Sequence, residues 1–272
     1  MVDDVFRYEN YKLAKLEIGK GLLSGIKKNP ILVTNADDRE LQIFRDLPIS
    51  KQYTFSLSDF SPYRLSPEET SFTWNSKSIK SSFVGKFNLE NALAALTLAE
   101  SFEIPEKRIV SAISNFKGTL GRVEKIEMGQ KFTVIVDYAH TADSMKKLYE
   151  TFLSPRVCVF GATGGGRDTW KRPEMGEVAS DYCDHIILTN DDPYDEDPHK
   201  IIEEIKKGIE KEVVIEIDRR KAIALGLSCA TPGSTVLITG KGTDPYLMEA
   251  NGKRTPWDDV AVTKEELQKI FK

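Results

Sequence analysis

This sequence of 272 residues has few cysteines, no long apolar run and no excess of charge of one sign. No apolar run approaches the roughly 18 residues of a membrane-spanning helix, and the N-terminus lacks a signal-peptide core. Lys and Arg total 38 against 42 for Asp and Glu, which gives a formal net charge of -4. We therefore expect neither a membrane partner nor a broad surface for nucleic acid.

The cysteines Cys158, Cys183 and Cys229 are odd in number and lack the spacing of a metal site. Each falls in a stretch that has the pattern of a strand or a helix. Free cysteines usually pack as small hydrophobic residues. We therefore expect three free core residues in a protein of the reducing cytoplasm.

The most informative stretch is residues 157–176, VCVFGATGGGRDTWKRPEMG. An apolar run typical of a buried strand leads into a glycine-rich turn, and Arg167, Asp168, Lys171 and Arg172 follow. Guanidinium groups bind carboxylates and phosphates bidentately, so the stretch suits an anionic substrate. Taken alone, it is equally compatible with a solvated basic loop that follows an ordinary strand.

The same arrangement recurs through the second half, where apolar runs alternate with stretches of helical spacing. This alternation favours right-handed crossovers and a parallel sheet covered on both faces. Besides the run that begins at Val157, the expected strands are residues 134–137, 186–190, 213–218 and 235–240. The expected helices are residues 144–152, 171–179, 198–209 and 219–229.

Polar clusters follow four of these expected strands. They are DYAH at 137–140, the glycine-rich turn, NDDP at 190–193 and GKGTD at 240–244. Ligands of parallel sheets bind at the carboxyl ends of the strands. We therefore expect the four clusters to meet in one ligand site.

The first half has a different pattern. Expected helices are residues 11–23, 39–44, a helix from near Asn88 and residues 105–113, and expected strands are residues 31–35, 53–57, 71–74 and 79–84. The length suggests two domains. The pattern breaks at two glycines near residues 117–121, so we expect domains of residues 1–120 and 121–272.

Six motifs, in this order, resemble those of the Mur ligase family, and within it the enzymes that add the third amino acid to UDP-N-acetylmuramoyl dipeptide. They are GKFNLENALAA from 85, GRVE from 121, DYAHTADS from 137, GGGRDTWKRPEMG from 164, NDDP from 190 and GKGTD from 240. The resemblance covers nearly the whole chain. It implies an α/β fold: an incomplete central ATPase-type α/β domain followed by a Rossmann-like doubly wound, mostly parallel sheet domain.

The resemblance also implies an ATP-dependent ligase of peptidoglycan synthesis in the cytoplasm, with Mg²⁺ as a further cofactor. ATP would phosphorylate the carboxylate of the nucleotide-linked peptide, and the amine of an amino acid would displace the phosphate. Asn88 and Asn91 would contact the adenine, Arg122 the nucleotide phosphates and Asp137 the ribose hydroxyls. The alternatives are a helix cap for the asparagines and surface salt bridges for Arg122 and Asp137.

Two further residues match catalytic positions of the family. His140 resembles a loop histidine near the nucleotide, although a lone histidine is more often structural. Lys15 matches the position where a lysine is carbamylated and helps to hold the second Mg²⁺. Without that modification, Lys15 would be an ordinary lysine on an amphipathic helix.

The amino-acid pocket departs from the relatives that select meso-diaminopimelate. Those relatives have an arginine after aspartate-asparagine-proline, whereas this chain has Asp191, Asp192, Pro193 and Tyr194. Without the arginine, the second carboxylate of diaminopimelate has no bidentate partner there. The resemblance therefore implies lysine or ornithine as the added amino acid.

Other pocket residues follow from the same resemblance. Arg167 would hold the α-carboxylate of the amino acid, and Asp191, together with Asp195 and Glu196, would supply negative charge for its side-chain ammonium. Gly240 and Asp244 belong to the motif that ends in a histidine and a glutamate in relatives. Asp244 is one methylene shorter than that glutamate.

A phosphate loop of the type G-x-x-G-K-[ST] is missing from the 272 residues. The uridine-nucleotide domain of the family is missing as well. We consider a fragment of a longer ligase, one half of a split enzyme whose partner chain supplies these parts, and a pseudo-ligase that binds without catalysis. From a different class, a non-catalytic nucleotide or amino-acid binding module is the main rival, and a dehydrogenase is a weaker one because the glycine pattern differs.

Overall fold

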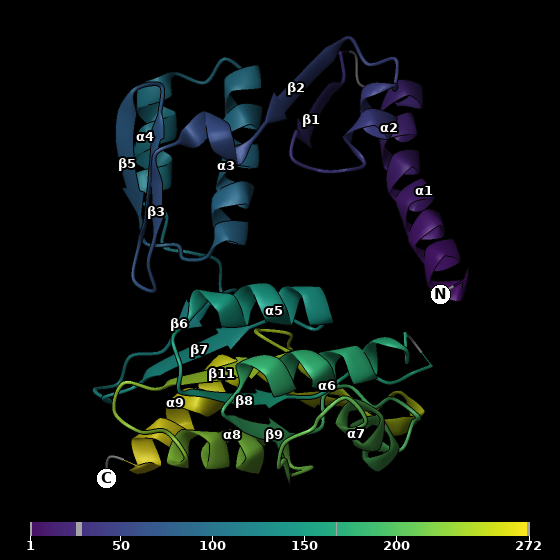
Figure 1. Ribbon diagram of the computed structural model, residues 1–272, viewed down its shortest axis with the longest axis vertical. Coiled ribbons are helices and arrows are strands. Elements are labelled where there is room, and N and C mark those ends of the chain that lie inside the picture. Colours follow the sequence, from purple (N-terminus) through teal and green to yellow (C-terminus); the bar gives the residue numbers. More distant parts are fainter. Residues whose placement is uncertain (1, 26–28, 167, 271–272) are drawn as a thin grey trace. The chain divides into compact units, whose positions relative to one another are not determined.

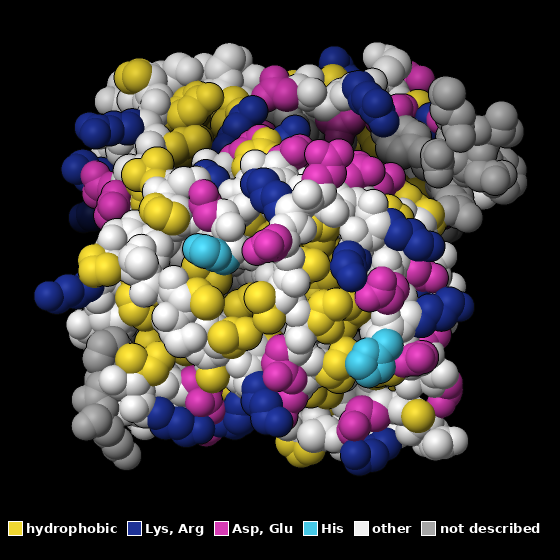
Figure 2. Space-filling model, turned by 60° about the horizontal axis from the view of Figure 1, so that its bottom comes forward, with side chains coloured by type: hydrophobic (Ala, Val, Ile, Leu, Met, Phe, Trp, Pro, Cys, Tyr) yellow, Lys and Arg dark blue, Asp and Glu magenta, His cyan; other side chains and the backbone are white. Residues whose placement is uncertain are grey.

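The computed structural model describes residues 2–25, 29–166 and 168–270. The chain forms two compact units, Met1–Phe116 and Lys117–Lys272 (Figure 1). No helix in the described ranges is long and apolar enough to cross a membrane. On the face shown in Figure 2, lysine and arginine side chains are interspersed with aspartate and glutamate, in keeping with the small net charge.

The first unit combines helices with two small sheets. Strands β1 and β2 are parallel, and β3, β4 and β5 form an antiparallel meander. Phe72, Trp74 and Ile79 pack with Leu89 and Leu93 of α3 in the core of this unit. The elements are α1 (Val2–Ser24), β1 (Ile31–Asn35), α2 (Leu41–Arg45), β2 (Lys51–Phe55), η1 (Leu57–Phe60), β3 (Tyr63–Leu65), β4 (Thr70–Trp74), β5 (Lys77–Ser81), α3 (Lys86–Ser101) and α4 (Glu106–Ser114).

The second unit contains a six-stranded sheet with the order β10-β9-β8-β11-β7-β6. All pairs are parallel except β6 with β7. The elements are β6 (Glu124–Lys125), β7 (Thr133–Asp137), α5 (Ala142–Thr151), β8 (Arg156–Phe160), α6 (Lys171–Tyr182), β9 (His185–Leu188), α7 (Pro198–Lys206), β10 (Val214–Ile215), α8 (Arg219–Ser228), β11 (Thr235–Thr239), β12 (Tyr246–Met248), η2 (Ala250–Gly252), β13 (Arg254–Pro256) and α9 (Asp259–Ile270).

Helices cover both faces of this sheet. Helices α5, α6 and α7 lie side by side on one face, and α8 and α9 lie on the other (Figure 1). Every residue of β11 is buried, because helices cover it on both faces and β8 and β7 flank it. The expected α/β fold class with a mostly parallel sheet is therefore confirmed.

The strand expected at residues 213–218 is much shorter in the structure. Only Val214 and Ile215 pair with β9, at the edge of the sheet. Their exposed fractions are 49% and 38%, and β10 is the last strand in the order of the sheet. An apolar run thus indicated a strand but not its length.

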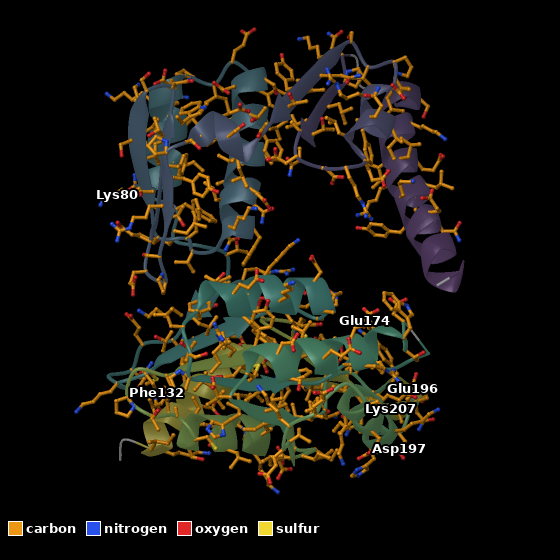
Figure 3. The ribbon with its side chains drawn as sticks, in the orientation of Figure 1. Lys80, Phe132, Glu174, Glu196, Asp197 and Lys207 are labelled. Carbon is orange, nitrogen blue, oxygen red and sulfur yellow. A yellow bond between two sulfur atoms is a disulfide. The ribbon has the colours of Figure 1, made fainter. Side chains whose placement is uncertain are left out.

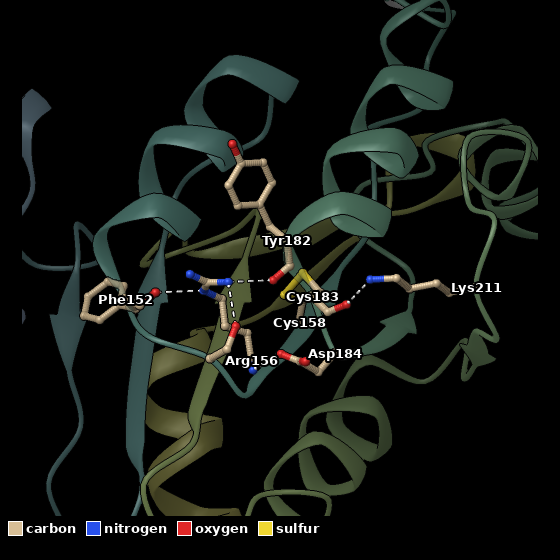
Figure 4. Close-up of a disulfide and its surroundings, with 8 residues drawn as sticks. Phe152, Arg156, Cys158, Tyr182, Cys183, Asp184 and Lys211 are labelled. Carbon is tan, nitrogen blue, oxygen red and sulfur yellow. Dashed lines mark hydrogen bonds between the residues drawn. A yellow bond between two sulfur atoms is a disulfide. The ribbon is translucent and has the colours of Figure 1, made fainter.

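Cys158 and Cys183 are both buried, as expected, but the expectation that they are free was wrong. They form a disulfide between β8 and the residue that ends α6 (Figure 4). The Arg156 side chain lies close by and donates to the carbonyls of Phe152 and Tyr182, at 2.8 and 2.9 Å. Cys229 has no disulfide partner and is half-buried.

The disulfide should stabilise the second unit. It joins residues separated by 25 positions, and closing a loop of that size in the unfolded chain stabilises the native state by about 3 kcal/mol. We expect a C158A/C183A double variant to lose about that free energy in urea unfolding, and C229A to stay within about 1 kcal/mol of the parent. Alkylation of all three cysteines in denatured, unreduced protein would contradict the disulfide.

Candidate functional site

Four parallel strands end at the same edge of the second unit. The loops after β7, β8, β9 and β11 therefore emerge together. Figure 3 labels Phe132, just before β7, and Glu196, beyond β9, at opposite ends of this unit. The carboxyl edge thus carries Asp137, His140, Asp191, Asp192, Pro193, Tyr194, Gly240 and Asp244, all of which were expected at one site. Arg167 lies outside the described residues.

A buried ion pair joins two of these strand ends. The Arg219 guanidinium donates to both carboxylate oxygens of Asp259, at 2.8 and 2.7 Å. It also donates to the carbonyls of Asn190, at 3.2 Å, and Thr239, at 2.9 Å. Asn190 follows β9 and Thr239 ends β11, so one side chain holds the two acidic loops at a fixed spacing. Sequence reasoning did not single out either member of the pair.

Lys241 connects the same two loops through bonds to their carboxylates. Its buried ammonium donates to both carboxylate oxygens of Asp192, at 2.9 and 2.8 Å, and to Asp244, at 3.1 Å. Burial lowers the pKa of Lys241, but its bonds to Asp192 and the charge of Asp191 raise that pKa overall. Lys241 therefore stays cationic between several carboxylates. Asp244, with a side chain 33% exposed, is the one that faces solvent most.

Asp191 lies between this group and the Arg219 pair. Asp191 is 3% exposed. Burial raises the pKa of its carboxyl group to about 6, although the charge of Arg219 lowers that pKa. Gly240 has a φ of +117°, and a Cβ there would come within 2.6 Å of an Asp191 carboxylate oxygen. Because Gly240 has no side chain, the carboxylate of Asp191 fits beside it.

The glycine-rich loop, residues 161–166, packs against the loop after β9. The Gly164 amide donates to the Asp192 carbonyl at 2.6 Å. A Cβ on Gly164 would lie 2.2 Å from the Pro193 carbonyl oxygen, so no other residue fits without a shift. The ring of Tyr194 lies beside Gly165 and is half-buried. The expected anion loop and the acidic loop are therefore packed into one surface.

Two acidic residues expected to serve the ligand have other partners. Asp195 accepts a hydrogen bond from the Asn251 amide at 2.8 Å. Glu196 accepts hydrogen bonds from the Gly166 amide and from Arg172. Asp191, Asp192 and Asp244 are the carboxylates that lie together around Lys241.

In the loop after β7, Tyr138 contacts both His140 and Arg122, which lies just before β6. The Arg122 guanidinium lies 4.4 Å from the centroid of the Tyr138 ring, a cation–π geometry. The His140 ring contacts the same tyrosine edge to face, and its Nδ1 lies 2.8 Å from the Tyr138 carbonyl oxygen. Arg122 and His140 are both exposed, so their outer atoms are accessible to a ligand.

Asp137, at the end of β7, also has a structural role. Its carboxylate accepts hydrogen bonds from the Val123 and Ala139 amides, each at 2.7 Å. Burial raises its pKa, although these bonds and Arg122 lower it. A carboxylate has about four lone-pair sites, so these bonds leave capacity for a ligand hydroxyl.

In the first unit, Asn88 and Asn91 lie in the first two turns of α3. The helix begins at Lys86 with Gly85 as its N-cap residue, so the alternative that Asn88 is the cap was wrong. Asn88 instead donates to the Val84 carbonyl at 2.9 Å. The side chain of Asn91 is exposed.

Lys15 lies on α1, where its ammonium is 5.3 Å from the centroid of the Tyr11 ring. It lines a cavity of about 330 Å³ together with Asp38 and Glu40. Oxygen donors of this kind suit Mg²⁺, but Lys15 joins them only if it is carbamylated. Within the part of the chain that the structure describes, no three His, Cys, Asp or Glu side chains gather around a possible metal position.

The chain is similar to curated proteins from several bacteria. A 2,6-diaminopimelate ligase acting on UDP-N-acetylmuramoyl-L-alanyl-D-glutamate, from Syntrophomonas wolfei, is 36% identical over 96% of this chain and 56% of its own length. A UDP-N-acetylmuramyl-tripeptide synthetase from Roseiflexus sp. is 35% identical over 90% of this chain and 52% of its own length. The chain thus spans about half the length of these relatives.

Solved structures give the same result for the fold. A structure of a UDP-N-acetylmuramoyl-L-alanyl-D-glutamate 2,6-diaminopimelate ligase superposes with a TM-score of 0.58 and 30% identity, covering 89% of this chain and 54% of that one. The MurF ligase of Thermotoga maritima in complex with ADP shares the fold, with a TM-score of 0.62 at 19% identity over 90% of this chain and 53% of that one.

Two domain models of one family match most of the chain. The Mur ligase middle domain matches residues 2–99. The glutamate ligase domain of Mur ligases matches residues 121–242, which include the loops after β7, β8 and β9 and the start of the loop after β11. The chain therefore belongs to the Mur ligase family, whose members are ATP-dependent ligases.

Proposed function

We propose that this chain forms part of a cytoplasmic ligase of peptidoglycan synthesis that adds lysine or ornithine to UDP-N-acetylmuramoyl dipeptide. The observation that carries the proposal is the group of carboxylates at the carboxyl edge. Asp191, Asp192 and Asp244 surround the single ammonium of Lys241. Arg219 is already paired with Asp259, so the group has an excess of negative charge. Such an excess favours an amino acid with a cationic side chain.

Residues of each unit would have a role in this chemistry. ATP would supply the phosphoryl group that activates the peptide carboxylate, and the residues of this chain would bind and orient the reactants. Asn88 and Asn91 would contact the adenine. Arg122 would contact the nucleotide phosphates, Asp137 the ribose, and His140 would lie near the nucleotide. Mg²⁺, which neutralises phosphate charge in such reactions, would contact Lys15 if that residue is carbamylated.

The choice of amino acid rests on Tyr194 and its neighbours. The relative from Syntrophomonas wolfei is named for 2,6-diaminopimelate, which carries a carboxylate at the end of its side chain. In this chain the ring of Tyr194 beside Gly165 offers no cation for such a carboxylate. Asp191 and Asp244 would repel it, and would attract the ammonium of lysine or ornithine.

The phosphate loop of the proposed ligase would come from outside the 272 residues. The GKGT sequence at Gly240 leads into the β12–β13 hairpin, whereas a phosphate loop leads into a helix N-terminus. A longer form of the chain or a separate partner chain would supply this loop and the uridine-nucleotide domain.

The isolated chain should therefore be a poor ATPase. Phosphate release from ATP with Mg²⁺, dipeptide substrate and lysine should not exceed the background of a buffer control. Adding a Mur ligase fragment that carries the phosphate loop should restore turnover if the parts can assemble. Ligation by the 272-residue chain alone, as a monomer, would contradict this proposal.

Amino-acid selection can be measured by isothermal titration of the chain with lysine, ornithine and meso-diaminopimelate. One well-placed charge contact changes affinity about tenfold, or about 1.4 kcal/mol. We therefore expect lysine or ornithine to bind at least about tenfold more tightly than diaminopimelate. Preference for diaminopimelate would reject the proposed substrate.

The same binding should depend on pH through Asp191, whose pKa burial raises to about 6. As the pH falls from 7.5 to 5, the carboxylate takes up a proton and loses its charge, so lysine should bind about tenfold more weakly. D191N should bind weakly at both pH values. D195N is the matched control, because Asp195 bonds the Asn251 amide, and it should keep the parental pH dependence. An unchanged pH dependence in D191N would count against the role of Asp191.

A further inference from the structure

Arg172 is a completely buried arginine close to the proposed amino-acid site. It lies in the first turn of α6, and its side chain is 0% exposed. Its guanidinium donates to Glu204 at 2.6 Å, to Glu196 at 2.9 Å and to the Thr163 carbonyl at 3.1 Å. One side chain thus contacts α7, the loop after β9 and the glycine-rich loop.

Glu196 links Arg172 to the end of the glycine-rich loop. One of its carboxylate oxygens accepts from Arg172, and the other accepts from the amide of Gly166. Glu196 lies just before α7 (Figure 3). The carboxylate is therefore shared between a buried cation and the end of the glycine-rich loop, directly before residue 167.

Elsewhere along their described contact, the two loops meet through backbone groups and through the Tyr194 ring beside Gly165. The Gly164 amide donates to the Asp192 carbonyl, and Gly164 packs closely against Pro193. Hydrogen bonds to an ionised group are about twice as strong as neutral ones, so Glu196 adds a stronger contact at the end of the glycine-rich loop. Because a buried arginine is costly to leave unpaired, Arg172 favours the arrangement in which both Glu196 and the Thr163 carbonyl stay in place.

We propose that Arg172 and Glu196 are positioning residues for the amino-acid site: together they hold the glycine-rich loop, residues 161–166, against the acidic loop after β9. The proposal rests on the proposed function for its effect on amino-acid binding. It does not require either side chain to touch the amino acid. Glu196 acts through the Gly166 amide, and Arg172 acts through Glu196 and the Thr163 carbonyl.

Glu204 provides a matched control for Glu196. Both carboxylates pair with Arg172, and their side chains are 22% and 21% exposed. Glu204 uses one oxygen for Arg172, so E204Q can keep that hydrogen bond through its amide oxygen. Glu196 uses both oxygens, so E196Q, with a single acceptor oxygen, must lose either Gly166 or Arg172.

The test is amide hydrogen exchange of the full 272-residue chain, combined with titration of lysine. In E196Q, the amides of residues 164–166 should exchange at least about tenfold faster, and lysine should bind about tenfold more weakly. E204Q should change both quantities less than about twofold. E196D, which keeps the charge but shortens the side chain, should fall between the parent and E196Q, and it replaces E196Q if that variant does not fold.

The outcomes separate the two proposals. Equal effects of E196Q and E204Q, or faster loop exchange in E196Q with unchanged lysine affinity, would overturn the positioning role. If the parent chain binds no lysine, ornithine or diaminopimelate, the proposed function fails. In that case the exchange rates alone decide whether Glu196 holds the loop, and unchanged rates in E196Q overturn that contact as well.

Discussion

The site at the carboxyl edge depends on the buried ion pair of Arg219 and Asp259. The pair fixes the ends of β9 and β11 relative to each other, because Arg219 also donates to the carbonyls of Asn190 and Thr239. Breaking a buried pair by removing one partner typically costs about 3–5 kcal/mol, since the other charge stays buried. The loops that carry Asp191 and Lys241 therefore begin from a rigid base. This rigidity allows like charges to stay close together in the site.

The charged side chains of the site lie next to this ion pair. Asp191 lies next to Arg219, and Lys241 lies between Asp192 and Asp244. Each cation stabilises carboxylates that would otherwise repel one another, while the group as a whole remains negative. A cationic ligand would neutralise part of this negative charge, whereas a ligand with an additional carboxylate would add to it. In this account, the specificity comes from the whole group of charges, and Tyr194 contributes by lacking a charge of its own.

Apolar runs predicted the strands of the second unit well, because a parallel sheet covered by helices buries whole runs of residues. The same reasoning failed for β10, whose length is set by its neighbour at the sheet edge. It also missed the hairpin β12–β13 and the helix α9, which contributes Asp259. The motifs correctly predicted that the loops lie at one edge. The sequence did not predict contacts between residues far apart in the chain, namely the Cys158–Cys183 disulfide, the Arg219 pair and the contacts of Glu196. Such pairs depend on spatial proximity, which local spacing does not encode.

The proposed site for a cationic amino acid is formed by the loops after β8, β9 and β11. An NMR titration of the isotope-labelled chain with lysine tests it most directly. We expect amide shift changes concentrated at residues 161–166, 190–194 and 240–244, with none at the opposite edge of the sheet near Phe132 and Gly233, which line a separate cavity. Shift changes at that opposite edge, or spread evenly over the second unit, would contradict it.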